Sequence, residues 1–84
     1  MFEIQLSNQA AKFIKKSDKT LAKRFFDKLD LLKVDPVLHD SKKILNEKNA
    51  FRVRVGGYRI LYTIYYETKI IIVSKIDKRP RVYD

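Results

Sequence analysis

The sequence has no cysteine, a single histidine and only two glycines among its 84 residues. Without cysteine the chain has neither a disulfide framework nor a thiolate metal site. The one histidine, His39, cannot build a metal site alone, and it has no cysteine with which to form a nucleophilic pair. We interpret His39 as a loop residue and expect neither a metal ion nor another cofactor.

Long apolar runs are also missing. No run approaches the roughly 20 residues of a membrane-spanning helix, and the N-terminus lacks the basic and then apolar layout of a signal peptide. We therefore expect a cytoplasmic protein that does not contact a membrane. The length predicts a single domain over residues 1–84, and the 45% share of hydrophobic residues is typical of a globular fold.

Acidic residues are scarce relative to basic ones. Lysine and arginine number 19 against 10 acidic residues, which gives a net charge of +9 at pH 7. A surface of this charge attracts a polyanion or an acidic protein. Solubility alone is the simpler explanation, but in so short a chain we favour a functional one.

The first half of the sequence predicts a strand followed by two helices. Apolar residues alternate over residues 1–6, as they do in a strand. Ser7 and Asp18 each precede a run with helical spacing and can cap a helix. The dipeptide Asp35-Pro36 ends the second helix, because a residue before proline avoids the helical conformation. The two helices are expected to form an antiparallel hairpin.

The hydrophobic period changes from 3.6 to 2 in the second half. Residues 36–50 are predicted to form a polar connection, with a possible helical turn around Ile44 and Leu45. Three further strands are predicted over residues 51–55, 58–66 and 69–76. The last is apolar on both faces and is expected inside the sheet. The expected fold class is α+β in the order β-α-α-β-β-β, a mainly antiparallel sheet with the helical hairpin packed on one face.

The turn at Gly56-Gly57 predicts the register of a β-hairpin, because both glycines can adopt positive φ. A two-residue turn sets Arg54 opposite Arg59 and places both, with Arg52, on the sheet face away from the helices. Like charges that oppose each other across a sheet repel, and no acid is predicted among their neighbours. Because arginine's planar fork suits phosphate, this face is predicted to bind phosphate, although a solvated polar face is the alternative.

Aromatic side chains are expected near these arginines. Tyr65 and Tyr83 can supply rings of the kind that stack on unpaired RNA bases. Tyr65 is also compatible with ordinary packing. Tyr83 stands in a polar tail, where packing explains it less well.

Two segments resemble the RelE/ParE toxin superfamily. Residues 51–62, Phe-Arg-Val-Arg-Val-Gly-Gly-Tyr-Arg-Ile-Leu-Tyr, are similar to its signature, and residues 76–83, Ile-Asp-Lys-Arg-Pro-Arg-Val-Tyr, are similar to its tail. The predicted element order also matches, so the resemblance covers essentially the whole chain. It implies a RelE-like fold and a RelE-type mRNA interferase, the toxin of a type II toxin-antitoxin system. Such an endoribonuclease enters the ribosomal A site and cuts mRNA without a metal, by attack of the 2′-hydroxyl on the adjacent phosphate.

The resemblance also implies roles for individual residues. The implied catalytic residues are Arg54, Arg59, Arg79 and Tyr83, and the implied RNA-binding residues are Arg52, Lys78 and Arg81. Arg59 and Arg79 would place positive charge on the phosphate oxygens. RelE-type enzymes often carry lysine at the positions of Arg52 and Arg54. Because arginine stays protonated, Arg54 is predicted to clamp the transition state, and Tyr83, Lys78 or ribosomal RNA would move the proton.

The implied partners are the ribosome, mRNA and a small acidic RelB-like antitoxin, which would form a hetero-oligomer with the toxin. Two other functions fit the sequence. A ParE-like protein would share the fold and inhibit DNA gyrase without cutting RNA. A non-catalytic RNA- or ribosome-binding module would also use an arginine-rich face.

Overall fold

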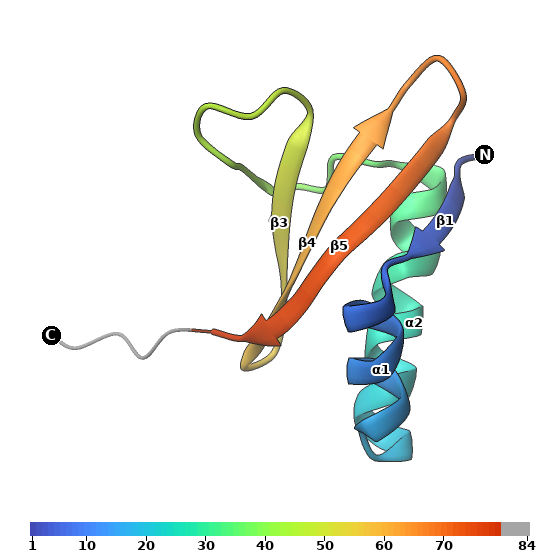
Figure 1. The fold of residues 1–84 in the computed structure, drawn as a ribbon, viewed down its shortest axis with the longest axis vertical. Helices are drawn as coiled ribbons and strands as arrows, with labels where there is room; N and C mark the ends of the chain where they lie inside the picture. Colours follow the sequence, from blue (N-terminus) through green and yellow to red (C-terminus); the bar gives the residue numbers. More distant parts are fainter. Residues whose placement is uncertain (80–84) are drawn as a thin grey trace, which may run out of the picture.

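The computed structural model describes residues 1–79 of the chain. Two helices, α1 (Asn8–Lys16) and α2 (Lys19–Val34), lie side by side on one face of a five-stranded sheet (Figure 1). The strands are β1 (Glu3–Leu6), β2 (Lys42–Lys43), β3 (Ala50–Val55), β4 (Tyr58–Tyr65) and β5 (Ile70–Lys78). Their order is β1-β5-β4-β3-β2, with β1 parallel to β5 and the other pairs antiparallel. This arrangement confirms the predicted α+β fold and the helical hairpin on one face of the sheet.

Both helices begin where the sequence predicts. Ser7 Oγ and Asp18 Oδ1 each accept a hydrogen bond from a backbone N–H in the first turn of their helix, at 3.1 Å and 2.8 Å. These bonds satisfy donors that a helix start otherwise leaves unpaired. Helix α2 ends at its C-cap Asp35, directly before Pro36, as predicted.

The predicted hairpin register is confirmed. Arg54 lies opposite Arg59, with Val53 opposite Ile60 and Val55 opposite Tyr58. Of the two turn glycines, Gly56 alone has a positive φ, of 58°. A positive φ at the first central residue alone fits a type II′ turn better than a type I′ turn, which needs it at both.

The segment between α2 and β3 differs from the prediction. No helical turn forms at Ile44 and Leu45; instead Lys42 and Lys43 form the two-residue strand β2, which pairs with the start of β3. Positive φ values at Asn46 and Asn49 then reverse the chain toward β3. Asparagine tolerates this left-handed conformation better than most residues. The two asparagines therefore set the path of the loop, and a search for hydrophobic periodicity does not detect them.

The C-terminal strand is longer and less regular than predicted. Strand β5 continues to Lys78, and its pairing with β4 shifts register between Leu61 and Tyr62, where Ser74 is the extra residue. Such a bulge inverts the alternation of side chains beyond it. Val73 and Ile76 are therefore both buried, although three positions separate them, and Asp77 emerges on the face away from the helices.

The core lies between the sheet and the helices. Its fully buried members come from α2 and from β3, β4 and β5: Phe25, Leu32, Val53, Ile60, Tyr62, Ile64, Ile71, Val73 and Ile76. Phe13 of α1, Phe25 of α2 and Tyr58 of β4 pack edge to face, with ring centroids 5.8–6.0 Å apart. This contact between both helices and the start of β4 fixes the turn end of the hairpin.

Candidate functional site

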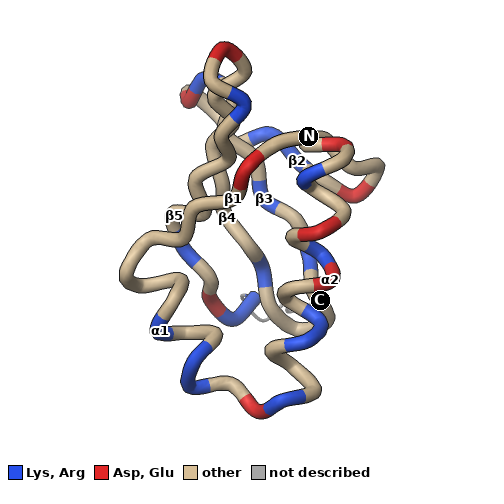
Figure 2. Tube along the Cα trace, turned by 90° about the vertical axis from the view of Figure 1, so that its right-hand side faces the viewer, with Lys and Arg blue, Asp and Glu red and all other residues tan. Residues whose placement is uncertain are grey.

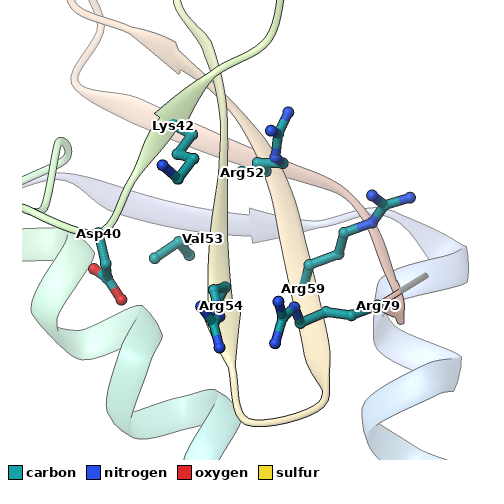
Figure 3. Close-up of a pocket in the computed structure, with 7 residues that line it drawn as sticks. All are labelled: Asp40, Lys42, Arg52, Val53, Arg54, Arg59 and Arg79. Carbon is teal, nitrogen blue, oxygen red and sulfur yellow. The ribbon is translucent and has the colours of Figure 1, made fainter. Parts of the chain in front are cut away.

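A basic pocket lies where β3, β4 and the end of β5 meet on the sheet face away from the helices (Figure 3). Its volume is about 400 Å³, and its lining residues are Asp40, Lys42, Arg52, Val53, Arg54, Arg59 and Arg79. Five of these seven side chains are basic and one is acidic. A pocket with this lining attracts a bound anion, because the mutual repulsion of the cations falls when negative charge enters.

Arg54 and Arg79 approach each other across the pocket. Figure 3 shows the Arg79 side chain directed toward Arg54 from the far side of β4. The backbone N–H of Arg79 donates to the carbonyl oxygen of Gly57 at 2.8 Å, which holds this residue at the hairpin turn. Neither side chain forms an ion pair with an acid among residues 1–79. The two guanidinium groups are therefore available to a phosphate.

Arg59 has an acidic neighbour, although the sequence predicted none. Its Nε and Nη2 donate to Asp77 Oδ1 and Oδ2 at 2.7 Å and 3.2 Å, and Lys75 Nζ lies 3.7 Å from Oδ2. The hydrogen bond to Asp77 raises the pKa of Arg59 above its ordinary value. The prediction was wrong because it ended the last strand at residue 76, whereas β5 continues to Lys78 and the bulge at Ser74 turns Asp77 toward Arg59.

Lys78 does not join the arginines. It lies opposite Tyr58 in the β4–β5 register, and residues that oppose each other share a sheet face. Tyr58 packs against the helices, so Lys78 belongs to the helix side. The basic residue on the pocket side of β5 is Lys75, opposite Leu61.

The pocket includes two residues that sequence reasoning missed. Lys42 lies opposite Arg52 and so shares its face, but no periodic pattern marks the two-residue strand β2. Asp40 lies in the same connection, and its Oδ2 accepts from Lys28 Nζ at 3.0 Å. This bond lowers the pKa of Asp40 below its ordinary value of 3.8. Asp40 Oδ1 is buried and finds no hydrogen-bond partner among the described residues.

Of the two predicted aromatic residues, Tyr65 is described by the structure, and it lies away from the pocket. Tyr65 is half exposed at the far end of β4, six residues from Arg59, which is about 20 Å along a strand. Tyr83 and Arg81, predicted for catalysis and RNA binding, lie outside the described residues. Arg24 of α2 is a basic residue that was not predicted for the site: its guanidinium lies over Gly56 at the hairpin turn.

Positive charge extends beyond the pocket. Figure 2 shows basic positions on the helical hairpin as well as on the strands. Helix α1 carries Lys12, Lys15 and Lys16 and no acid.

Among residues 1–79, no three His, Asp or Glu side chains group closely enough to hold a metal ion. In the same residues neither helix has the length and apolarity needed to cross a membrane.

Comparisons with known proteins agree with this fold. The chain is 27% identical to a protein of Methanocaldococcus jannaschii that carries the toxin name RelE1, over 98% of this chain and 94% of that protein. It is similar in fold to the archaeal RelE-RelB complex from Pyrococcus horikoshii OT3, with a TM-score of 0.83, 23% identity and coverage of 96% of this chain and 98% of that one. The isolated E. coli RelE toxin gives a TM-score of 0.85 at 19% identity, over 98% of this chain and 88% of that one.

A family model identifies the protein more directly. The model, described as the ParE toxin of the type II toxin-antitoxin system parDE, matches residues 4–83 and therefore nearly the whole chain. The named relative and the solved structures carry RelE names within the same superfamily. The protein belongs to the RelE/ParE family of type II toxin-antitoxin toxins.

Proposed function

We propose that this toxin is a ribosome-dependent endoribonuclease that acts in the cytoplasm and cleaves mRNA in the ribosomal A site. The observation that supports this most strongly is the pocket of four arginines and one lysine on the sheet face that the helices leave uncovered. A protein that only binds another protein has no need for guanidinium groups that face each other across a basic pocket, as those of Arg54 and Arg79 do. The cleavage of a phosphodiester does need such groups, because the phosphate oxygens gain negative charge in the transition state.

The proposed reaction uses the RNA as its own nucleophile. The 2′-oxygen forms a bond to the adjacent phosphorus while the bond from phosphorus to the 5′-oxygen breaks, which leaves a cyclic phosphate and a 5′-hydroxyl. The 2′-hydroxyl loses a proton and the 5′-oxygen gains one. Arg54 and Arg79 would clamp the non-bridging oxygens, and Arg59 would add a third guanidinium from β4.

Proton transfer is the part of the mechanism that the arginines do not explain. An arginine stays protonated and is a poor base, and Lys78 lies on the helix side of the sheet. We assign base stacking and orientation of the 2′-hydroxyl to Tyr83. Tyr83 or ribosomal RNA would then move the proton.

The proposed partner is a small acidic antitoxin of the RelB type. Several structural neighbours are toxin-antitoxin complexes of RelE with RelB. The net charge of +9 favours association with an acidic chain. High salt should slow the association of toxin and antitoxin, because it screens this attraction.

A gyrase inhibitor is the second candidate, because the family model that matches is that of ParE toxins. The test is to incubate the purified protein with translating ribosomes and map message ends by primer extension, in parallel with a gyrase supercoiling assay. Cleavage within the A-site codon would support the proposal. Inhibition of supercoiling without cleavage would reject it in favour of the ParE-like function, and ribosome binding alone would identify a non-catalytic module.

A further inference from the structure

The acid that pairs with Arg59 has no role in the proposed chemistry. Asp77 is the single acidic residue of β5, and it lies directly opposite Arg59 on the pocket side of the sheet. Both of its oxygens accept from Arg59, at 2.7 Å from Nε and 3.2 Å from Nη2. An acid beside a phosphate site weakens the binding of phosphate, so its presence needs a physical reason.

The geometry of the pair provides that reason. A guanidinium has five N–H groups in a rigid plane. Asp77 engages one edge of the plane, through Nε and Nη2, and no other residue among residues 1–79 engages the donors of Nη1 or the second donor of Nη2. Because Arg59 also lines the pocket, these remaining donors form a second fork for a phosphate.

Among residues 1–79 the pair is shielded about as well as the pair of Lys28 and Asp40, and better than the remaining ion pairs. The side chains of Arg59 and Asp77 are 30% and 21% exposed, whereas those of the helical pair Lys23 and Asp27 are 75% and 60% exposed. Solvent screens a pair that is mostly exposed, which therefore orders its side chains only weakly. The bond of Arg59 to Asp77 can instead hold a long side chain in one rotamer.

The backbone around Asp77 is fixed by the start of α1. Strand β1 ends at Leu6, and beyond it the Gln9 side chain takes the place of a neighbouring strand. Gln9 Nε2 donates to the Ile76 carbonyl at 2.8 Å, and the Ile76 N–H donates to Gln9 Oε1 at 2.9 Å. The residue before Asp77 is thus held on both of its backbone groups.

We infer that Asp77 is a positioning residue, which holds Arg59 so that its second fork faces the scissile phosphate. This inference rests on the proposed function. A clamp that is already in place loses less entropy when the transition state forms, and its misplacement by about 1 Å can cost up to about 100-fold in rate. Asp77 acts through Arg59 and does not touch the substrate.

The test compares Asp77→Asn with wild type and with Asp27→Asn, which removes the same charge from the exposed pair on α2. Single-turnover cleavage of ribosome-bound message is measured at saturating and at limiting toxin. For Asp77→Asn we expect a rate at saturation lowered by roughly 10- to 100-fold, with toxin binding unchanged or tighter. Asp77→Glu, which keeps the charge, should recover part of the rate. An Asp77→Asn rate equal to or above that of Asp27→Asn would overturn the inference and leave Asp77 as a mere competitor of phosphate.

A second measurement separates this inference from the proposed function. In NMR spectra the Arg59 Nε–H should exchange slowly with solvent in wild type and in Asp27→Asn, and quickly in Asp77→Asn. Fast exchange in wild type would overturn the inference, whether or not the protein cleaves RNA. Slow exchange in a wild-type protein without cleavage would reject the proposed function, while still showing that Asp77 fixes the guanidinium.

Discussion

Arg79 donates its backbone N–H to the Gly57 carbonyl oxygen at 2.8 Å, so the arginine that follows β5 is fixed at the turn between β3 and β4. The bond joins the two segments that carry the basic pocket. It uses the main chain and leaves the guanidinium of Arg79 to extend toward Arg54 (Figure 3). Among residues 1–79, the position of this side chain therefore depends on the hairpin and on no ion pair.

Arg79→Ala should abolish most of the cleavage while the protein stays folded. The substitution keeps the backbone bond to Gly57 and removes the charge, and loss of one electrostatic contact to a transition state typically costs on the order of 10²–10³ in rate. Single-turnover cleavage on ribosomes measures the loss, and circular dichroism checks the fold. Lys78→Ala removes the same charge from the adjacent residue on the helix side. An equal loss in both variants would show that net charge, not the position of Arg79, controls the rate.

Gln9→Ala should loosen the end of β5. The change leaves the partly buried N–H and carbonyl of Ile76 without partners, which typically costs about 1–3 kcal/mol of unfolding free energy. Urea denaturation measures this cost, and hydrogen exchange of the Ile76 amide locates it. Gln5→Ala, an exposed change on β1, serves as the control. An Ile76 amide that stays protected in Gln9→Ala would contradict the prediction.

The two glycines of the hairpin turn should respond differently to alanine. Gly56 has a φ of 58°, and an added Cβ would lie 2.6 Å from Nη2 of Arg24. Gly56→Ala should cost about 1–2 kcal/mol, because a left-handed conformation strains any residue with a Cβ. A Cβ on Gly57 meets no atom within 4 Å, so Gly57→Ala should be neutral or stabilise by up to about 1 kcal/mol. Thermal unfolding of both variants measures the difference, and equal effects would count against the turn geometry.

Stability should fall in acid partly through Asp40. Its bond to Lys28 lowers the pKa of the carboxyl in the folded protein below the ordinary 3.8. A lowered folded pKa contributes stability above the ordinary value, and this contribution is lost as pH falls through the lowered one. Asp40→Asn should therefore be less stable than wild type near pH 7, with the difference shrinking below about pH 4. Urea titrations at several pH values check this, and a constant difference down to low pH would contradict it.

The sequence by itself determined the parts that depend on neighbouring residues. Ser7 and Asp18 cap their helices through bonds within one turn. The turn at Gly56-Gly57 sets Arg54 opposite Arg59 because a two-residue loop allows one register. These features follow from local geometry, which the order of residue types specifies.

Only the tertiary structure decided which charges meet. Asp77 reaches Arg59, and Lys78 is excluded from the pocket, because one bulged residue at Ser74 inverts the faces of β5 beyond it. The bulge residue is held from elsewhere: its carbonyl accepts from Ser7 Oγ at 2.8 Å, across 67 positions of the chain. Lys42 lines the pocket from strand β2, whose two residues are too few to show the alternation of apolar and polar side chains that marks a strand in a sequence. Side chains alternate between the two faces of a sheet, so the sequence predicts the face of each residue only while the strand has no bulge. The register between strands that are distant in the sequence is set by packing rather than by local sequence.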